Sequence, residues 1–373
     1  MTRLLLVGGG HSHVQVLLGL AARRAADLQV TVVSRDILTP YSGMLPGVVA
    51  GHYEPADALI DLAPLCEAAG AELLQAEVDR LDPAAGTAGT GDGRSWGYDL
   101  VSINCGSAPG LGPIPSATEI GVAVKPISGF LSRWEHLLAH LRERRGDTFR
   151  LVVVGAGAGG VEMALALNYR LREREACRGL QVSLIDAAES ILPGHDPGLA
   201  RRLDAILARQ GVDFRGGTRI AEALSDGLIM DTGDIIAADE VLWVTDAGAQ
   251  PWPGEAGLAV DRRGFIRVDA GLRSLSHPNV FATGDIVSFA PEALPKAGVY
   301  AVRQGPLLAD NLLRAAAGRP LRDYRPQRHY LVLISTGNRY AVAARGRWTA
   351  EGAWAWRWKD WIDRRFIRRF RRH

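Results

Sequence analysis

A strand, a glycine turn, a helix and a second strand follow one another twice along this chain, and this repeat restricts the fold more than any other feature. In that order the first copy spans residues 3–7, 8–10, 11–26 and 30–34, and the second spans residues 151–154, 155–160, 161–172 and 181–185. The strands are short apolar runs, and the helices carry apolar residues at helical spacing. Such alternation is typical of parallel sheets with helices on both faces. We therefore predict an α/β fold with two three-layer units built on parallel sheets.

The second glycine turn carries the stronger binding signal. Residues 155–160 satisfy G-x-G-x-x-G, with Gly155, Gly157 and Gly160 at the glycine positions, directly after a strand and at the head of a helix. In that setting the backbone and the helix N-terminus can approach a pyrophosphate. Asp186 ends the next strand, where a carboxylate binds the adenosine ribose and repels a 2′-phosphate. We predict a dinucleotide site that favours NADH; the alternatives are a turn made for packing and a mere surface acid.

The first glycine turn departs from the same pattern at two positions. Gly8 and Gly10 are present, but His13 occupies the third glycine position and Ser34, not an acid, ends the second strand. If this turn binds a dinucleotide, an imidazole must fit where helix and strand usually touch, and a hydroxyl must replace the ribose-binding carboxylate. His11 and His13 do not indicate a metal site, because side chains two apart on a helix diverge and no third ligand is evident. We expect no metal.

A third element lies late in the chain. Residues 279–283 form an apolar strand that runs into Gly284 and Asp285, and residues 298–313 have helical spacing. An acid at a strand end can bind a polyol hydroxyl, and the helix can direct its positive N-terminus toward an electron-rich ring. An ordinary turn at the strand end is the alternative.

Composition narrows the class of protein. The chain has 373 residues, 47% hydrophobic and 23% charged, as in ordered globular proteins of two or three domains. Its three cysteines lack the spacing of disulfide or metal pairs, which agrees with a reducing, cytoplasmic setting. No apolar run approaches the length of a membrane span, and glycines and histidines interrupt the first one, so we expect neither a span nor a secretion signal.

The formal net charge of +2 is unevenly distributed. Residues 357–373 contain eight arginines and lysines but two aspartates, so a basic tail ends a mildly acidic body. Trp354, Trp358 and Trp361 begin a series of apolar residues at spacings of three or four. Such a helix can lie at a membrane surface, with arginines at anionic headgroups, or pack on the body. Nucleic-acid binding is a poorer explanation, because no nucleic-acid fold accompanies the tail.

Taken in order, these motifs resemble the two-dinucleotide flavoprotein oxidoreductases. In that family an N-terminal glycine turn binds FAD, a mid-chain turn binds NAD(P)H, and the aspartate of a late Thr-Gly-Asp holds the FAD ribityl chain. The matching residues here are Gly8, Gly10, Gly155, Gly157, Gly160, Glu162, Gly284 and Asp285. Residues 98–107 are similar to the family's crossover strand, with Asn-Cys-Gly where Ala-Thr-Gly is usual, and the resemblance implies that Gly106 contacts the cofactor.

The resemblance also implies a domain plan. We expect a discontinuous FAD-binding domain at residues 1–115 and 263–322, with an NAD(P)H-binding domain nested in it at residues 116–262. Both domains are expected to be Rossmann-like. Residues 323–373 would form a small C-terminal α+β region that includes the basic, Trp-rich tail.

Within the family, residues 38–47 and 295–305 are most similar to type II NADH dehydrogenases. They resemble still more closely the flavoprotein module fused ahead of selenophosphate synthase, which shares the Gly-Gly-Gly-His-Ser-His turn and the Trp-Lys-Asp-Trp-Ile-Asp-Arg ending. The resemblance makes His13 and Ser34 features of a subfamily and implies that Pro40 contacts FAD. One departure lies in the late helix, where Tyr300 replaces the first glutamine of the dehydrogenases' A-Q-x-A-x-Q and only Gln304 is kept.

The resemblance implies a relay in which NADH reduces the flavin and the flavin reduces an external two-electron acceptor, foremost a quinone. Lys296 would supply positive charge near the reduced flavin, and Glu162 would lie near the nicotinamide. A solvated lysine and an acid that merely suits the helix dipole are the alternatives. Disulfide reductases do not fit, because no cysteines are paired, and sulfide:quinone reductases do not, because no cysteine follows Cys177.

The acceptor and the location stay open at this point. Because Tyr300 weakens the quinone step, a soluble electron carrier or a partner in selenium metabolism is an alternative acceptor. A flavin-bearing sensor or binding module is the non-enzyme alternative. We expect a cytoplasmic protein, attached peripherally to the inner face of the membrane if the tail binds lipid.

Overall fold

The computed structural model describes residues 1–23, 27–110, 114, 116–117, 119–125, 127–143, 148–175, 177 and 179–371. Its first large sheet has the strand order β21-β9-β1-β2-β5, and every pairing in it is parallel. The strands are β1 (Thr2–Val7), β2 (Leu28–Ser34), β5 (Ala71–Gln75), β9 (Leu100–Ile103) and β21 (Val280–Ala282). The helices α1 (His11–Arg23), α3 (Leu62–Ala69) and α8 (Gly298–Ala316) pack with this sheet in one continuous core.

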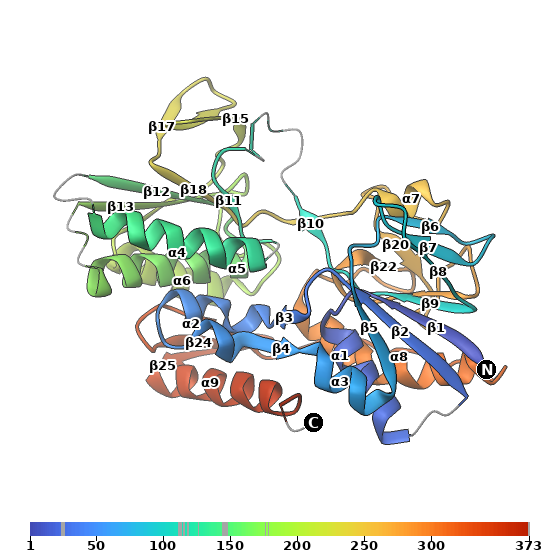
Figure 1. The fold of residues 1–373 in the computed structure, drawn as a ribbon. Coiled ribbons are helices and arrows are strands. Elements are labelled where there is room, and N and C mark those ends of the chain that lie inside the picture. Colours follow the sequence, from blue (N-terminus) through green and yellow to red (C-terminus); the bar gives the residue numbers. More distant parts are fainter. Residues whose placement is uncertain are drawn as a thin grey trace.

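The second large sheet has the order β11-β18-β12-β13-β14 and is also parallel throughout. Its strands are β11 (Val122–Ala123), β12 (Phe149–Val154), β13 (Leu180–Ile185), β14 (Val212–Arg215) and β18 (Glu240–Trp243). The helices α4 (Ile127–Glu143), α5 (Ala158–Tyr169) and α6 (Pro197–Arg209) lie together below it in Figure 1. Because β21 follows this whole sheet in the chain yet belongs to the first one, the second sheet is nested within the first.

Two antiparallel crossings join the sheets. β10 (Ala108–Pro109) leaves the first sheet, β19 (Ala247–Gly248) returns to it, and the two segments pair with each other. Figure 1 shows β10 bridging the two halves of the molecule. Proline and glycine, which interrupt regular structure, are frequent in both crossing segments.

Smaller elements complete the two halves. The strands are β3 (Leu38–Pro40), β4 (Leu59–Asp61), β6 (Arg80–Asp82), β7 (Thr87–Gly89), β8 (Ser95–Gly97), β15 (Ile220–Leu224), β16 (Gly227–Met230), β17 (Ile235–Ala237), β20 (Ile266–Val268) and β22 (Val287–Phe289), and the short helices are α2 (Leu45–Val49) and α7 (Trp252–Glu255). β6, β7 and β8 form an antiparallel meander between β5 and β9.

The C-terminal region forms a three-stranded antiparallel sheet and one helix. The strands are β23 (Val332–Ser335), β24 (Ala341–Arg345) and β25 (Trp348–Gly352), and the helix is α9 (Ala353–Arg368). Phe366, Ile367 and Phe370 are buried in the core of the first sheet, whereas Trp354, Trp358 and Trp361 stay 42%, 38% and 50% exposed. The end of the tail therefore packs on the body, while three of its tryptophans face outward.

The structure confirms the predicted fold class, two parallel α/β sheets with one nested in the other. Local limits differ: the helix expected at residues 161–172 starts at Ala158 and ends at Tyr169, followed by a π-helical turn, Arg170–Arg174. The residue limits of the domains remain predictions. In the part of the chain that is described, no helix combines the length and apolarity needed to cross a bilayer.

Candidate functional site

A cavity of about 510 Å³ opens at the carboxyl edge of the first sheet. The carboxyl ends of parallel strands are the usual ligand-binding edge of such sheets. The cavity lining includes these predicted cofactor contacts: Gly8, Gly10, Ser34, Pro40, Gly106, Gly284 and Asp285. Residues predicted from four separate strand ends therefore meet around one cavity.

His13 does not line the cavity but contacts the glycine turn that does. The imidazole is fully buried, with Nδ1 2.6 Å from the carbonyl oxygen of Gly8 and Nε2 2.8 Å from Oγ of Ser102 on β9. Since a carbonyl only accepts, Nδ1 must carry the proton and Nε2 accepts from the serine hydroxyl. Burial lowers the pKa of His13 to about 4, so the ring is neutral at neutral pH. The histidine at the third glycine position thus connects the first turn to the neighbouring strand.

Asn104 joins the turn to the late Thr-Gly-Asp segment. Its Oδ1 accepts the backbone N–H groups of Ser12 and His13, at 3.1 and 3.3 Å, which are among the unpaired donors at the start of α1. Its Nδ2 donates to the carbonyl oxygen of Thr283 at 2.7 Å. The asparagine of this Asn-Cys-Gly segment therefore connects the start of α1 to the Thr-Gly-Asp segment.

Lys125 is a cavity residue that sequence reasoning missed. It follows β11, and its Nζ lies 2.8 Å from Oδ2 of Asp285 and 3.0 Å from Oγ of Ser107. Because Lys125 directly follows the edge strand of the second sheet, this ion pair connects the second half of the molecule to the acid of the first. A lone lysine between a short strand and a helix gave no pattern from which this contact could be predicted.

The contacts of Lys296 leave its predicted place near the reduced flavin a prediction. Its ammonium donates to the carbonyl oxygen of Val287 and lies 3.6 Å from the ring centroid of Phe265. Burial lowers its pKa to about 8, although Asp285 and Asp261 act in the opposite direction. Lys296 is not among the residues that line the cavity. Within this cavity lining, the lysine that pairs with Asp285 is Lys125.

The second glycine turn has the geometry that its motif requires. Gly155 has a φ of +109°, and a Cβ on Gly160 would collide with the carbonyl oxygen of Gly155. A Cβ on Gly157, by contrast, would meet no heavy atom within 4 Å, so the protein itself does not require a glycine there. Close approach of a ligand to the backbone is the physical reason that fits the second glycine.

Asp186 lies at this turn as predicted from the strand end. Its Oδ2 accepts the N–H of Ala156 at 2.5 Å and its Oδ1 accepts the N–H of Ala188 at 2.7 Å. The carboxylate is thereby fixed between the turn and the segment after β13, beside the backbone to which a dinucleotide would bind.

Glu162 belongs to a buried charged cluster that includes the tail helix. Its Oε1 accepts the N–H and the hydroxyl of Ser335, at 2.8 and 3.1 Å. Lys359 of α9 donates to Asp363 at 2.9 Å and to the carbonyl oxygen of Gly43 at 2.6 Å, and Tyr41 donates to Asp363 at 3.2 Å. Burial raises the pKa of Glu162, and the nearby Lys359 partly offsets this effect. The cluster connects the helix of the second turn, the segment after β3 and the tail.

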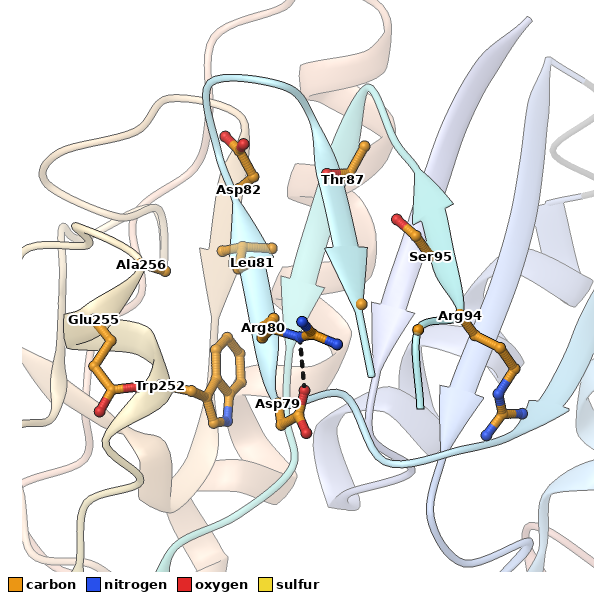
Figure 2. A pocket seen from close by; sticks show the side chains of 12 residues that line it. Asp79, Arg80, Leu81, Asp82, Thr87, Arg94, Ser95, Trp252, Glu255 and Ala256 are labelled. Atoms are coloured by element: carbon orange, nitrogen blue, oxygen red, sulfur yellow. Dashed lines mark ion pairs between the residues drawn. The ribbon is translucent and has the colours of Figure 1, made fainter. Parts of the chain in front are cut away.

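A separate hollow of about 430 Å³ lies between the β6–β8 meander and α7 (Figure 2). It contains Trp252, Glu255 and the ion pair of Asp79 with Arg80, whose N–O distance is 3.6 Å. None of the predicted site residues lines it. The candidate site is therefore the cavity at the sheet edge.

The thiols of Cys66 and Cys105 do not favour redox chemistry. Cys66 and Cys105 are free thiols, and burial raises their pKa values to about 11 and about 12. The protonated thiol is a weak nucleophile, whereas the thiolate is the reactive form of cysteine. Small packing residues are the interpretation that fits Cys66 and Cys105.

The nested parallel sheets and the cavity at their strand ends define the class: a two-domain FAD/NAD oxidoreductase fold. The chain belongs to the pyridine nucleotide-disulphide oxidoreductase family, whose sequence pattern matches residues 2–305. Membership confirms the predicted family. The finer similarity to the selenophosphate synthase module stays a prediction.

Individual relatives agree with this assignment. The chain is 30% identical over 301 residues to an NADH dehydrogenase-like protein of Mycobacterium tuberculosis, covering 77% of this chain and 73% of the relative. It is 22% identical over 341 residues to the type II NADH:quinone oxidoreductase of Staphylococcus saprophyticus, covering 86% and 84%. The sulfide:quinone oxidoreductase of Aquifex aeolicus has a similar fold, with a TM-score of 0.82, 19% identity and coverage of 100% and 92%.

Proposed function

We propose that this chain is an FAD-dependent NADH dehydrogenase that passes electrons from NADH through the flavin to a quinone. The observation that carries the proposal is the pair of glycine turns, one at the edge of each nested sheet, with the Thr-Gly-Asp acid beside the first. The names of the Mycobacterium and Staphylococcus relatives support it. When bound, the flavin takes up hydride from the nicotinamide and gives electrons to the second substrate.

The chain's own residues would bind and orient the two dinucleotides. The first turn, with Gly8 and Gly10, and the acid Asp285 would hold FAD in the cavity, and Lys125 would orient that acid. Gly157 and Asp186 would hold NADH at the second turn. We propose that residues 1–115 and 263–322 form the FAD-binding domain and that residues 116–262 form the NAD(P)H-binding domain.

Two charged side chains have proposed roles near the reacting rings. Glu162, in the first turns of α5, would lie near the nicotinamide. Its carboxyl also belongs to the charged cluster that includes the tail helix. Lys296 remains a candidate for positive charge near the reduced flavin, but its contacts with Val287 and Phe265 favour Lys125 for that role.

A soluble carrier or a partner in selenium metabolism is the second candidate acceptor. It is favoured by Tyr300, which stands where the quinone-reducing relatives' motif has a glutamine and whose ring packs on Tyr330, with 5.7 Å between centroids. The retained glutamine, Gln304, accepts the N–H of Gly284 at 2.9 Å and so supports the Thr-Gly-Asp turn. The resemblance to the selenophosphate synthase module points to the same alternative.

The outward face of the tail supports a peripheral membrane location. Trp348, Trp354 and Trp358 form a row in which neighbouring ring centroids are 6.4 and 6.3 Å apart, and Trp361 is half exposed beside Arg365. Exposed tryptophans flanked by arginines suit a lipid interface. We propose that this face attaches the protein to the cytoplasmic side of a membrane and gives the site access to quinone.

An acceptor screen tests the proposed function. The purified yellow protein would be supplied with NADH and, in separate assays, with a short-chain quinone, ferricyanide and a small iron–sulfur carrier. We expect the quinone to give the highest kcat/KM of the three acceptors. Turnover with the protein carrier alone would favour the second candidate, and no NADH oxidation with any acceptor would favour a sensor.

A further inference from the structure

His11 lines the cofactor cavity and has one buried ring nitrogen without a partner. It is the first residue of α1 and lines the cavity beside the glycine turn. Its Nε2 is shielded from solvent and has no hydrogen-bond partner among the residues that the structure describes. A hydrogen bond to the backbone of Pro40 engages the ring elsewhere. Buried polar atoms in native proteins nearly always have a partner, so an unpaired ring nitrogen at a cavity points to a ligand.

The surroundings of His11 indicate which ligand. Its ring stands edge-on to Tyr41 and Phe366, with centroid distances of 5.4 and 6.3 Å. Phe366 belongs to α9, and Tyr41 is bonded to Asp363 of the same helix. His11 thus lies between the cofactor cavity and the tail helix whose outer face carries the tryptophans. An apolar acceptor that reaches the flavin from the tail side would meet this imidazole.

The proposed contacts of the cofactor do not account for the nitrogen. The diphosphate is assigned to the turn backbone at Gly8–Gly10, and the ribityl chain to Asp285. The edge-on aromatic contacts instead place the His11 ring against two side chains that are not among the residues lining the cavity. This arrangement favours a role toward the second substrate.

We propose that His11 is a catalytic acid of the second half-reaction, which gives a proton from Nε2 to a quinone oxygen. This inference rests on the proposed function. A quinone takes up two electrons and two protons when it becomes a hydroquinone, and NADH supplies two electrons and one proton as hydride. The remaining proton comes from solvent: the N–H bond of the His11 imidazolium breaks, the O–H bond of the hydroquinone forms, and the neutral ring is protonated again from water.

The charged groups around His11 set the pH range of this step. Burial lowers the pKa of His11, Asp285 raises it and Lys125 lowers it. Lys359 and Asp363 face the same region from α9, and the Tyr41 hydroxyl stays protonated because burial raises its pKa. A depressed pKa makes the imidazolium a stronger acid, but it also restricts the protonated form to acidic pH. The rate of the quinone step should therefore fall as the pH rises through and above the His11 pKa.

Separate half-reactions test the proposal. In anaerobic stopped-flow experiments, His11→Gln keeps a polar side chain but cannot carry the proton, and His329→Gln, at an exposed histidine outside the cavity lining, is the matched control. We expect His11→Gln to be reduced by NADH at the wild-type rate and reoxidised by ferricyanide, which takes no proton, at the wild-type rate. Reoxidation by quinone should fall about 100-fold, in line with general acid catalysis, and lose its pH dependence.

A spectroscopic measurement keeps the test independent of turnover. In histidine-labelled holoprotein, the NMR signal absent from His11→Gln identifies His11, and we expect it to shift when a quinone is added to the wild type. Equal slowing of both reoxidations would assign His11 to the flavin and overturn the proposal, as would unchanged quinone reoxidation. A wild-type protein that NADH reduces but no quinone reoxidises would contradict the proposed function, and the role of His11 with it.

Discussion

The ammonium nitrogen of Lys125 lies 2.8 Å from a carboxylate oxygen of Asp285. The lysine follows the edge strand of the second sheet, and the aspartate follows the edge strand of the first, so one ion pair joins the two halves of the molecule at the cofactor cavity. The acid proposed to hold the ribityl chain is therefore oriented by a residue that belongs to the other sheet.

Replacing Lys125 should weaken flavin binding. In Lys125→Met, Asp285 loses a charged hydrogen-bond partner, and such bonds contribute about 1.5–3 kcal/mol, so we expect the Kd for FAD to rise roughly 10- to 100-fold. Titration of apoprotein with FAD, followed by quenching of flavin fluorescence, measures this. Lys296→Met is the comparison and should leave the Kd unchanged. A raised Kd in Lys296→Met with an unchanged Kd in Lys125→Met would instead favour Lys296 as the positive charge near the flavin.

His13 should make the stability of the protein depend on pH. Its pKa falls from 6.5 in the unfolded chain to about 4 in the fold. The unfolded state therefore binds a proton between these values while the folded state does not, and stability decreases as the pH falls through this range. The full difference is about 3 kcal/mol. Thermal unfolding at pH 7 and pH 5 should show it, and His13→Gln should be less stable at pH 7 but less sensitive to acid. An unchanged acid sensitivity in that variant would contradict His13 as the source of the pH dependence.

Asp186 should determine the choice between the two nicotinamide dinucleotides. Its carboxylate is fixed at the second turn by the N–H groups of Ala156 and Ala188. Asp186→Ser removes the charge that repels a 2′-phosphate, so we expect the ratio of kcat/KM for NADH over NADPH to fall by about 10-fold or more. Asp213→Ser, an exposed acid on β14, should leave this ratio unchanged. A loss of activity with both dinucleotides and no change in their ratio would indicate a purely structural role.

The pair of Lys359 and Asp363 should be a strong contributor to the docking of α9. The two side chains are only 12% and 5% exposed, and removal of one partner from a buried ion pair costs about 3–5 kcal/mol. We expect this loss in Lys359→Met. In Lys359→Met/Asp363→Leu no unpaired aspartate remains, so part of the stability should return. Urea unfolding of the wild type, the two single variants and the double variant measures the coupling energy between the two side chains. Losses of stability that simply add up in the double variant would contradict such a coupling.

The exposed tryptophans should control membrane binding. We expect wild-type protein to sediment with vesicles that contain an anionic phospholipid, less so at high salt because arginine contacts are screened. Replacement of Trp354, Trp358 and Trp361 by serine should reduce sedimentation without lowering the melting temperature. The control carries serine at Ile235 and Leu275, which are also exposed. Undiminished binding of the triple variant would contradict a lipid contact.

Much of the fold could be predicted because its signals are local. Alternating apolar strands and helices predicted the two parallel sheets, and the glycine turns predicted the strand ends at which the cavity opens. The role of His13 could not be predicted, since its partner Ser102 lies 89 residues away and no pattern connects them. The same is true of Lys125 and Asp285, 160 residues apart. The tail was left open between packing and exposure, and α9 does both on opposite faces.

Anaerobic titration of the holoprotein with NADH is the direct test of the proposed electron transfer. We expect that one equivalent of NADH bleaches the visible flavin absorbance and that a quinone, added afterwards without oxygen, restores it in full. A flavin that stays oxidised in excess NADH would contradict the dehydrogenase function. A flavin that is bleached by NADH but not restored by any quinone would contradict the quinone as acceptor.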